Sequence, residues 1–133
     1  MIREWFDIPG WEGYYQASIY GQIRSMERFH KTRNRWGPIV RKRTSQIMSQ
    51  CEGREGYFLV RLCRDGKPKM CAVARLVLAA CNRPPESGEE ACHINHNHQD
   101  NRIHNLEWGT RLHNEQQKTL AGRRRGPPRK HHD

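Results

Sequence analysis

A polar segment near the end of the chain, residues 92–114, constrains the fold most. Histidine, asparagine and aspartate fill its first half at a density that no hydrophobic core requires. Short apolar runs flank these residues, and Thr110 is a suitable cap for a helix over residues 111–120. The pattern predicts a strand ending at His93, a long polar loop, a second strand opening at Asn105, and then a helix.

The spacing of three residues in this segment would allow their side chains to point into one pocket. Asn105 follows His93 by twelve residues, and Asn114 follows Asn105 by nine. Imidazole is the natural base near neutral pH, and a carboxamide oxygen suits a hard divalent ion. Two other interpretations stay open. Asn and His side chains can satisfy the turns of their own loop, and His93, His96 and His98 could bind zinc, although they lack a matching distal pair.

Positive charge is concentrated in two segments. The chain carries 24 Lys and Arg against 14 Asp and Glu, for a net charge of +10. Residues 24–43 hold eight basic residues and one acidic residue, and residues 123–133 hold five and one. Concentrated charge of this kind gains affinity for a phosphate backbone by releasing counterions. Alone, it does not separate DNA from RNA or from an acidic protein.

The remainder of the sequence predicts short antiparallel elements. Short strands are expected over residues 14–18, 22–26 and 46–49. Asp65-Gly66, between apolar runs at residues 57–63 and 69–73, is a strong hairpin signal, and residues 74–81 are apolar enough for a buried helix. Between residues 27 and 44 periodicity disappears and positive charge dominates, which predicts a long loop.

Composition narrows the broad class of protein. No apolar run approaches the roughly 18 residues of a membrane span, and the N-terminus lacks the pattern of a secretion signal. We therefore expect a cytoplasmic protein with no membrane partner. A chain of 133 residues with 35% hydrophobic residues suits one domain or two very small ones. None of the five cysteines forms a Cys-x-x-Cys pair, so most are expected to be small buried residues.

Two motifs, in order, resemble the HNH endonucleases of phages and mobile introns. One is the run Asp100-Asn101-Arg102-Ile103-His104-Asn105-Leu106-Glu107-Trp108, which follows Cys92-His93. The other lies in residues 4–25, with Ile8-Pro9-Gly10 and Gly21-Gln22-Ile23-Arg24-Ser25, and is similar to the small nuclease-associated module that often precedes such a domain. The resemblance covers about residues 4–115. It implies an α+β protein, in which a small antiparallel-sheet N-terminal module is followed by a ββα-metal (His-Me finger) nuclease motif.

The resemblance also implies a division of the chain. Residues 1–45 would form the N-terminal nuclease-associated module with its basic loop. Residues 46–122 would form the HNH nuclease domain, with the ββα-metal motif at about residues 91–121. Residues 123–133 would be a disordered basic tail.

The same resemblance implies roles for four residues. His93 would be the general base, and Asn105 would hold its imidazole through the carboxamide. Asn114 would be a metal ligand, and the residue before the base is normally a second one, which here is Cys92. A thiolate prefers soft ions, so the expected cofactor is one divalent ion, either Mg²⁺ or Mn²⁺, with a softer transition ion possible because of Cys92.

The expected function is therefore that of a metal-dependent DNA endonuclease, which hydrolyses phosphodiester bonds by a nick or a double-strand break and could be a homing enzyme. The alternative is a non-catalytic nucleic-acid-binding protein with a degenerate HNH site. The expected partner is double-stranded DNA, bound by a monomer. Contacts to its backbone are expected from basic residues in three parts of the chain: Arg24, Arg28, Lys31, Arg33, Arg35, Arg41, Lys42, Arg43, Arg102, Arg123, Arg124 and Arg125.

Overall fold

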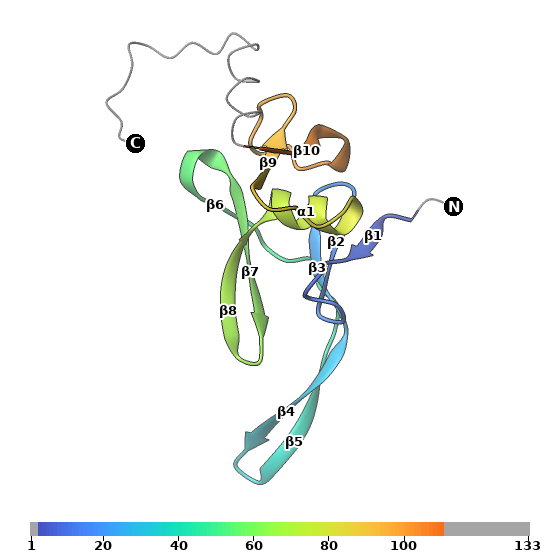
Figure 1. Ribbon diagram of the computed structural model, residues 1–133. Helices are drawn as coiled ribbons and strands as arrows, with labels where there is room; N and C mark the ends of the chain where they lie inside the picture. Colours follow the sequence, from blue (N-terminus) through green and yellow to red (C-terminus); the bar gives the residue numbers. More distant parts are fainter. Residues whose placement is uncertain (1–2, 111–133) are drawn as a thin grey trace.

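The computed structural model describes residues 3–110, which form four small antiparallel sheets and one α-helix (Figure 1). The first sheet has the order β1-β2-β3 and comprises β1 (Trp5–Asp7), β2 (Tyr15–Ser18) and β3 (Ile23–Ser25). The second has the order β6-β7-β8 and comprises β6 (Cys51–Glu52), β7 (Phe58–Arg64) and β8 (Lys67–Ala72), with the short 3₁₀ helix η1 (Arg54–Gly56) before β7. The expected α+β class is confirmed.

The helix α1 (Val73–Cys81) lies at the centre of the hydrophobic core. Its Val73, Val77 and Leu78 are fully buried, and it packs against the first two sheets and against the strands that follow it. Fully buried Ile23 comes from β3 and Leu62 from β7, so one core joins residues on both sides of the division expected at residues 45 and 46. Among residues 3–110, no helix has the length and apolar character needed to cross a membrane.

One predicted hairpin turn and one pair of hydrogen bonds hold the first two sheets in place. Asp65 and Gly66 both have positive φ, 55° and 74°, as the predicted two-residue hairpin turn requires. The Tyr15 hydroxyl accepts a hydrogen bond from the Cys63 N–H (2.9 Å) and donates one to the Cys63 carbonyl (3.1 Å). This pair of bonds ties β2 to β7 across the core.

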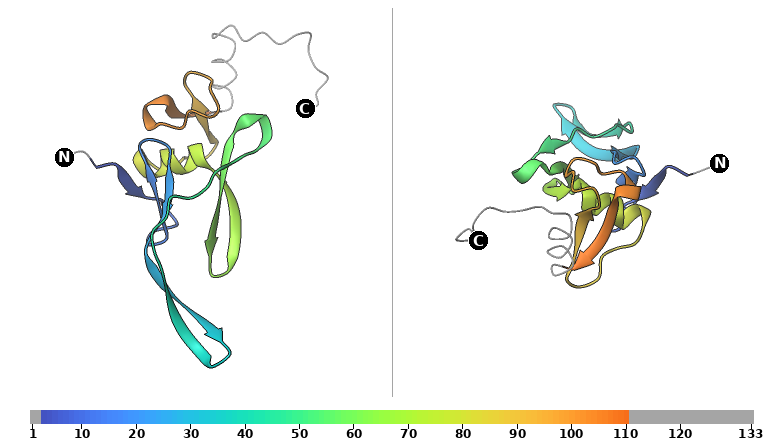
Figure 2. Two further views of the ribbon diagram at one scale, coloured as in Figure 1. Left: turned by 180° about the vertical axis from the view of Figure 1, so that it is seen from behind. Right: turned by 90° about the horizontal axis from the view of Figure 1, so that it is seen from above.

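The third sheet carries the polar segment. β9 (Glu89–His93) pairs with β10 (Leu106–Thr110), with His93 opposite Leu106, and the short 3₁₀ helix η2 (Ile103–Asn105) leads into β10. We call residues 94–105, between the two strands, the polar loop. The strand predicted to end at His93 is confirmed. Figure 2 shows this hairpin lying against α1. The helix predicted over residues 111–120 and the tail lie outside the described residues.

The long loop predicted over residues 27–44 is wrong. This segment is a hairpin of β4 (Arg28–Asn34) and β5 (Gly37–Arg43), with Arg28 opposite Arg43 and a turn at Arg35-Trp36. It pairs with no other sheet, and the half-buried positions of β4 (Arg28, His30, Thr32 and Asn34) are polar, so the apolar alternation that identifies a half-buried strand is absent. The strand predicted at residues 46–49 is reduced to one bridge between Ile47 and Arg24. We call the hairpin of β4 and β5 the basic ribbon.

Candidate active site and nucleic-acid interface

His93 is held at the end of β9 by a buried asparagine of the polar loop. Its side chain Nε2 lies 2.7 Å from the Oδ1 of Asn101, and the two residues are only 7% and 5% exposed. Because Oδ1 can only accept, Nε2 must carry the ring proton and donate it. The other ring nitrogen, Nδ1, is then the basic one. The contact therefore fixes both the tautomer and the orientation of the imidazole.

The expectation that Asn105 holds this imidazole is corrected. Asn105 Oδ1 accepts a hydrogen bond from the Asn95 backbone N–H (3.0 Å), and its Nδ2 donates to Asn95 Oδ1 and to the Asp100 carbonyl (2.9 Å each). Asn105 ends η2 with its carboxamide directed into the loop, so it pins the start of the loop to its far end. The sequence analysis did not identify Asn101, although this residue lies within the motif and its carboxamide contacts the imidazole of His93.

The turn between β2 and β3 of the N-terminal module packs against the backbone of Asn101. Gly21, in the turn between β2 and β3, has a φ of +88°, and a Cβ built on it would lie 3.0 Å from the Asn101 carbonyl oxygen. The Ile103 N–H donates to the Ile19 carbonyl (2.9 Å), and Gln50 Nε2 donates to the Gly21 carbonyl (3.0 Å). The backbone of Asn101 therefore rests on a position that only glycine fits without displacement.

Two further aromatic rings enclose His93. Tyr57 and His98 stack with centroids 4.1 Å apart, and each centroid lies 5.8 Å from that of His93. His98 Nδ1 also lies 2.9 Å from the carbonyl oxygen of Glu55, which has a positive φ of 59°. Burial lowers the pKa of His93 below its ordinary value, nearby His98 lowers it further, and the hydrogen bond with Asn101 opposes both. The net direction favours neutral imidazole, the form that can accept a proton.

The expected metal ligands are only partly described. Cys92 precedes His93 on β9 and lies directly opposite Glu107 of β10, so a thiol and a carboxylate share one face of the hairpin. A mixed sulfur and oxygen set fits a transition ion better than Mg²⁺. Within residues 3–110, no three His, Cys, Asp or Glu side chains gather as a metal-binding group. Asn114 lies outside the described residues.

Two of the basic residues expected to contact DNA are engaged within the chain. Arg102 makes two bonds of 2.7 Å to the carboxylate of Asp100, which hold the Asp100 pKa well below its usual range. Arg24 donates two hydrogen bonds to Gln16 Oε1 and lies 4.2 Å from the centroid of the Trp5 ring. Both guanidiniums therefore brace local structure.

The basic ribbon gathers the other expected residues that the structure describes. Its two strands extend away from α1, and Figure 1 places its tip and the polar loop at opposite ends of the molecule. Direct cross-strand partners share a face. One face carries Lys31, Arg33 and Lys42, and the other carries Arg28, Arg41 and Arg43. Arg35 is at the tip beside Trp36, which is 82% exposed. Arg123, Arg124 and Arg125 lie outside the described residues.

A histidine base fixed at the end of a strand, a loop closed by asparagine and a returning second strand define the ββ part of an HNH-type nuclease site. Comparisons with known proteins identify the same class. Residues 73–116 match the family described as HNH endonuclease, and residues 4–63 match the NUMOD4 motif. Residues 73–116 are therefore similar to HNH endonucleases, and residues 4–63 are similar to the NUMOD4 motif.

One relative is similar in both sequence and structure. DNA endonuclease I-HmuI of Bacillus phage SP01 is 29% identical over 107 residues, which is 80% of this chain. The solved structure titled "DNA binding and cleavage by the HNH homing endonuclease I-HmuI" superposes with a TM-score of 0.71 at 28% identity, covering 90% of this chain. The chain spans about half of that relative, 52% of its sequence and 60% of the chain in the structure.

Proposed function

We propose that this chain is a metal-dependent endonuclease that hydrolyses phosphodiester bonds of double-stranded DNA. The observation that carries the proposal is the contact between His93 Nε2 and Asn101 Oδ1, in a loop that Asn105 closes. This arrangement prepares one nitrogen of a neutral imidazole to accept a proton. The match of residues 73–116 to the HNH endonuclease family supplies the reaction class.

In this proposal the base is His93 Nδ1. It accepts a proton from the water that attacks phosphorus, while the proton on Nε2 stays in its bond to Asn101. Asn101 is a positioning residue, because it acts through His93. The lowered pKa keeps His93 unprotonated at neutral pH, so the base is available without prior deprotonation.

A divalent ion is general for this family and supplies charge stabilisation at the phosphate oxygens and the leaving group. We propose that Cys92 and Asn114 hold it. The carboxylate of Glu107 would add a negatively charged oxygen ligand, which the thiol of Cys92 cannot supply. The thiol makes Mn²⁺ or a softer ion the better partner, and Mg²⁺ the weaker one. Cys92→Asp should raise Mg²⁺-supported cleavage if residue 92 meets the metal. A destabilised variant with no gain in cleavage would remove Cys92 from the ligand set.

We propose further that the basic ribbon carries most of the DNA affinity of the described residues, and that the polar loop carries the chemistry. The ribbon has exposed basic residues on both faces and packs against no sheet. Seven residues per strand at roughly 3.3 Å each give it the reach to follow DNA away from the cleaved bond. In this proposal the chain binds as a monomer, with the module of residues 1–45, the nuclease domain of residues 46–122 and a basic tail acting on one duplex.

Incubating supercoiled plasmid with the purified chain tests the function. We expect nicked or linear product with Mn²⁺, less with Mg²⁺, and none with EDTA. The competing candidate, a DNA-binding protein without catalysis, is favoured by Cys92, a thiol at the position where the family normally has a harder metal ligand. It predicts a shifted DNA band with every ion and no product with any.

A further inference from the structure

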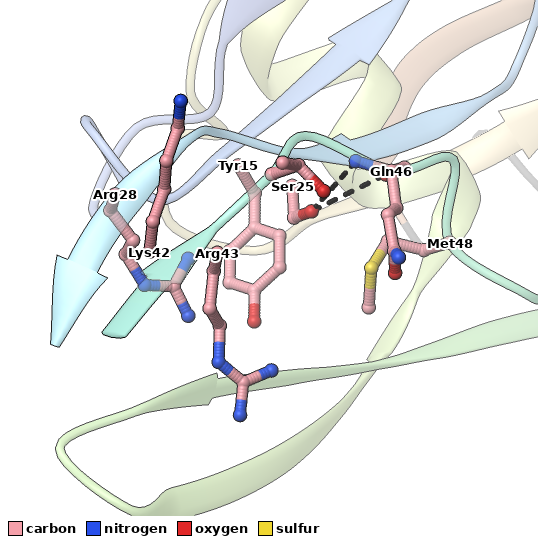
Figure 3. A pocket seen from close by; sticks show the side chains of 8 residues that line it. Tyr15, Ser25, Arg28, Lys42, Arg43, Gln46 and Met48 are labelled. Carbon is pink, nitrogen blue, oxygen red and sulfur yellow. Dashed lines mark hydrogen bonds between the residues drawn. The ribbon is translucent and has the colours of Figure 1, made fainter. Parts of the chain in front are cut away.

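A pocket at the base of the basic ribbon has the features of an anion-binding site. It opens where the ribbon joins the first sheet, and its lining includes Tyr15, Ser25, Arg28, Arg43, Gln46 and Met48 (Figure 3). Hydrogen bonds between Ser25 and Gln46 close one side. No Asp or Glu is among the described residues that line the pocket. Its electrostatic character is therefore positive.

Arg28 is the most distinctive residue of this pocket. Its guanidinium lies 5.0 Å from the centroid of the Tyr14 ring and 5.7 Å from that of Tyr15, so two rings restrict it. Its Nη1 is buried and has no hydrogen-bond partner among residues 3–110. Buried donors are normally paired, and an unpaired one is costly, so a shift of the guanidinium toward an acceptor in the pocket would remove this cost.

The surrounding charges lie on the same face of the ribbon as Arg28. Arg43 is its direct cross-strand partner, and both guanidiniums lie by the ring of Tyr15 in Figure 3. His30, two residues further along the same face, also has a buried nitrogen, Nδ1, without a partner among residues 3–110. Lys42 instead points away from the two guanidiniums and pairs with Glu27 at 3.0 Å.

We propose that this pocket binds a single backbone phosphate of DNA, with Arg28 as its principal ligand and Arg43 beside it. The planar guanidinium presents two parallel N–H donors that match the oxygens of a phosphate, which an ammonium group cannot do. The ring contacts restrict the side chain before binding, so less conformational entropy is lost. A phosphate held at this point would set the register of the duplex along the ribbon. The inference rests on the proposed DNA-binding function.

The test compares two substitutions that keep the charge, Arg28→Lys and Arg33→Lys, in the full chain. Arg33 lies on the other face of the ribbon and is exposed. Affinity for one short duplex is measured in EDTA over a series of salt concentrations. We expect Arg28→Lys to weaken binding about tenfold and Arg33→Lys to change it less than about twofold. Arg28→Gln should also reduce the log–log salt slope by roughly 0.9.

A second measurement separates the sources of the anion and controls for folding. Melting temperatures are compared in inorganic phosphate and in chloride at equal ionic strength. We expect phosphate to stabilise the wild type and Arg33→Lys, but not Arg28→Lys. Equal affinities of the two lysine variants for DNA would overturn the DNA-phosphate assignment, and stabilisation by free phosphate alongside them would reassign the pocket to a free anion. If the wild type bound no duplex at all, the proposed DNA-binding function would fall instead.

Discussion

The basic ribbon and the polar loop are both irregular in sequence, yet they are stabilised in opposite ways. The ribbon is held by its own cross-strand bonds and by a few contacts at its root, and two strands alone are only marginally stable in water. The polar loop is fixed by bonds from Asn105, by the stacked pair of Tyr57 and His98, and by the turn at Gly21. A surface that adapts to a long ligand tolerates flexibility, whereas a general base requires a fixed orientation.

The difference also changes what the N-terminal module does. Part of it, the ribbon, extends away from the core, while another part, the turn at Gly21, packs against the residue that orients His93. The module is therefore a structural part of the candidate active site as well as a source of positive charge.

The largest expected effect comes from removing the ribbon. Replacing residues 29–42 with Asn-Gly joins Arg28 and Arg43, which already face each other, through a favoured hairpin turn. The segment contributes nothing to the hydrophobic core, so the melting temperature should stay within a few degrees. DNA affinity should fall by about 100-fold or more near 0.1 M salt. Calorimetry with binding assays would check this, and a large loss of stability would show that the ribbon supports the fold.

The next prediction distinguishes the roles of Asn101 and Asn105 in the polar loop. Asn101→Ala removes the partner of His93 and should slow cleavage by about 10- to 100-fold. Asn105→Ala removes three hydrogen bonds that close the loop and should lower the free energy of unfolding by about 1–3 kcal/mol as well. Single-turnover rates and denaturation curves for both variants would check this. If Asn101→Ala cleaved DNA at the wild-type rate, Asn101 would not position His93, and Asn105 would again be the candidate for that role.

A glycine pair tests whether the N-terminal module supports the site. Gly21 and Gly13 have similar positive φ values, +88° and +84°, so alanine at either costs roughly 1–2 kcal/mol in backbone strain. Only at Gly21 does the added Cβ meet another residue, the backbone of Asn101. Gly21→Ala should therefore slow cleavage about tenfold more than Gly13→Ala, at similar melting temperatures. Equal rates would show that the contact has no catalytic consequence.

The smallest effect concerns the anchor of β9. Glu89 makes bonds of 2.8 and 2.9 Å to Arg83, which lower the pKa of its carboxyl to about 2. A lowered pKa stabilises the fold above the ordinary value of about 4.3, and this contribution disappears as pH falls toward 2. Glu89→Gln should therefore lower the melting temperature by a few degrees at pH 7 and by much less near pH 2. A difference that persisted at pH 2 would point to a packing effect.

The sequence predicted the elements whose residues pack against the core, because burial produces a readable pattern. The hairpin around Asp65-Gly66, the helix α1 and the strand ending at His93 are examples. It did not predict the ribbon, whose half-buried face on β4 is polar and leaves no apolar alternation, although Asn34 and Gly37 at its turn are typical turn residues.

The candidate site was predicted as a set of residues but not as a set of contacts. The spacing of the motif predicted that His93 and Asn105 lie at the two ends of one loop. Which asparagine meets the imidazole depends on the path of the polar loop, and that path depends on Gly21, about eighty residues earlier in the chain. A one-dimensional motif does not contain such a contact.

The most direct test of the account is the single-turnover cleavage rate of His93→Ala at saturating DNA, with Mn²⁺ present. If His93 transfers the proton and the ribbon supplies the DNA affinity, the His93→Ala variant should cleave DNA about 10²- to 10⁴-fold more slowly than the wild type. Its dissociation constant for DNA should be unchanged. A rate within a few-fold of the wild type would contradict the assignment of His93 as the base.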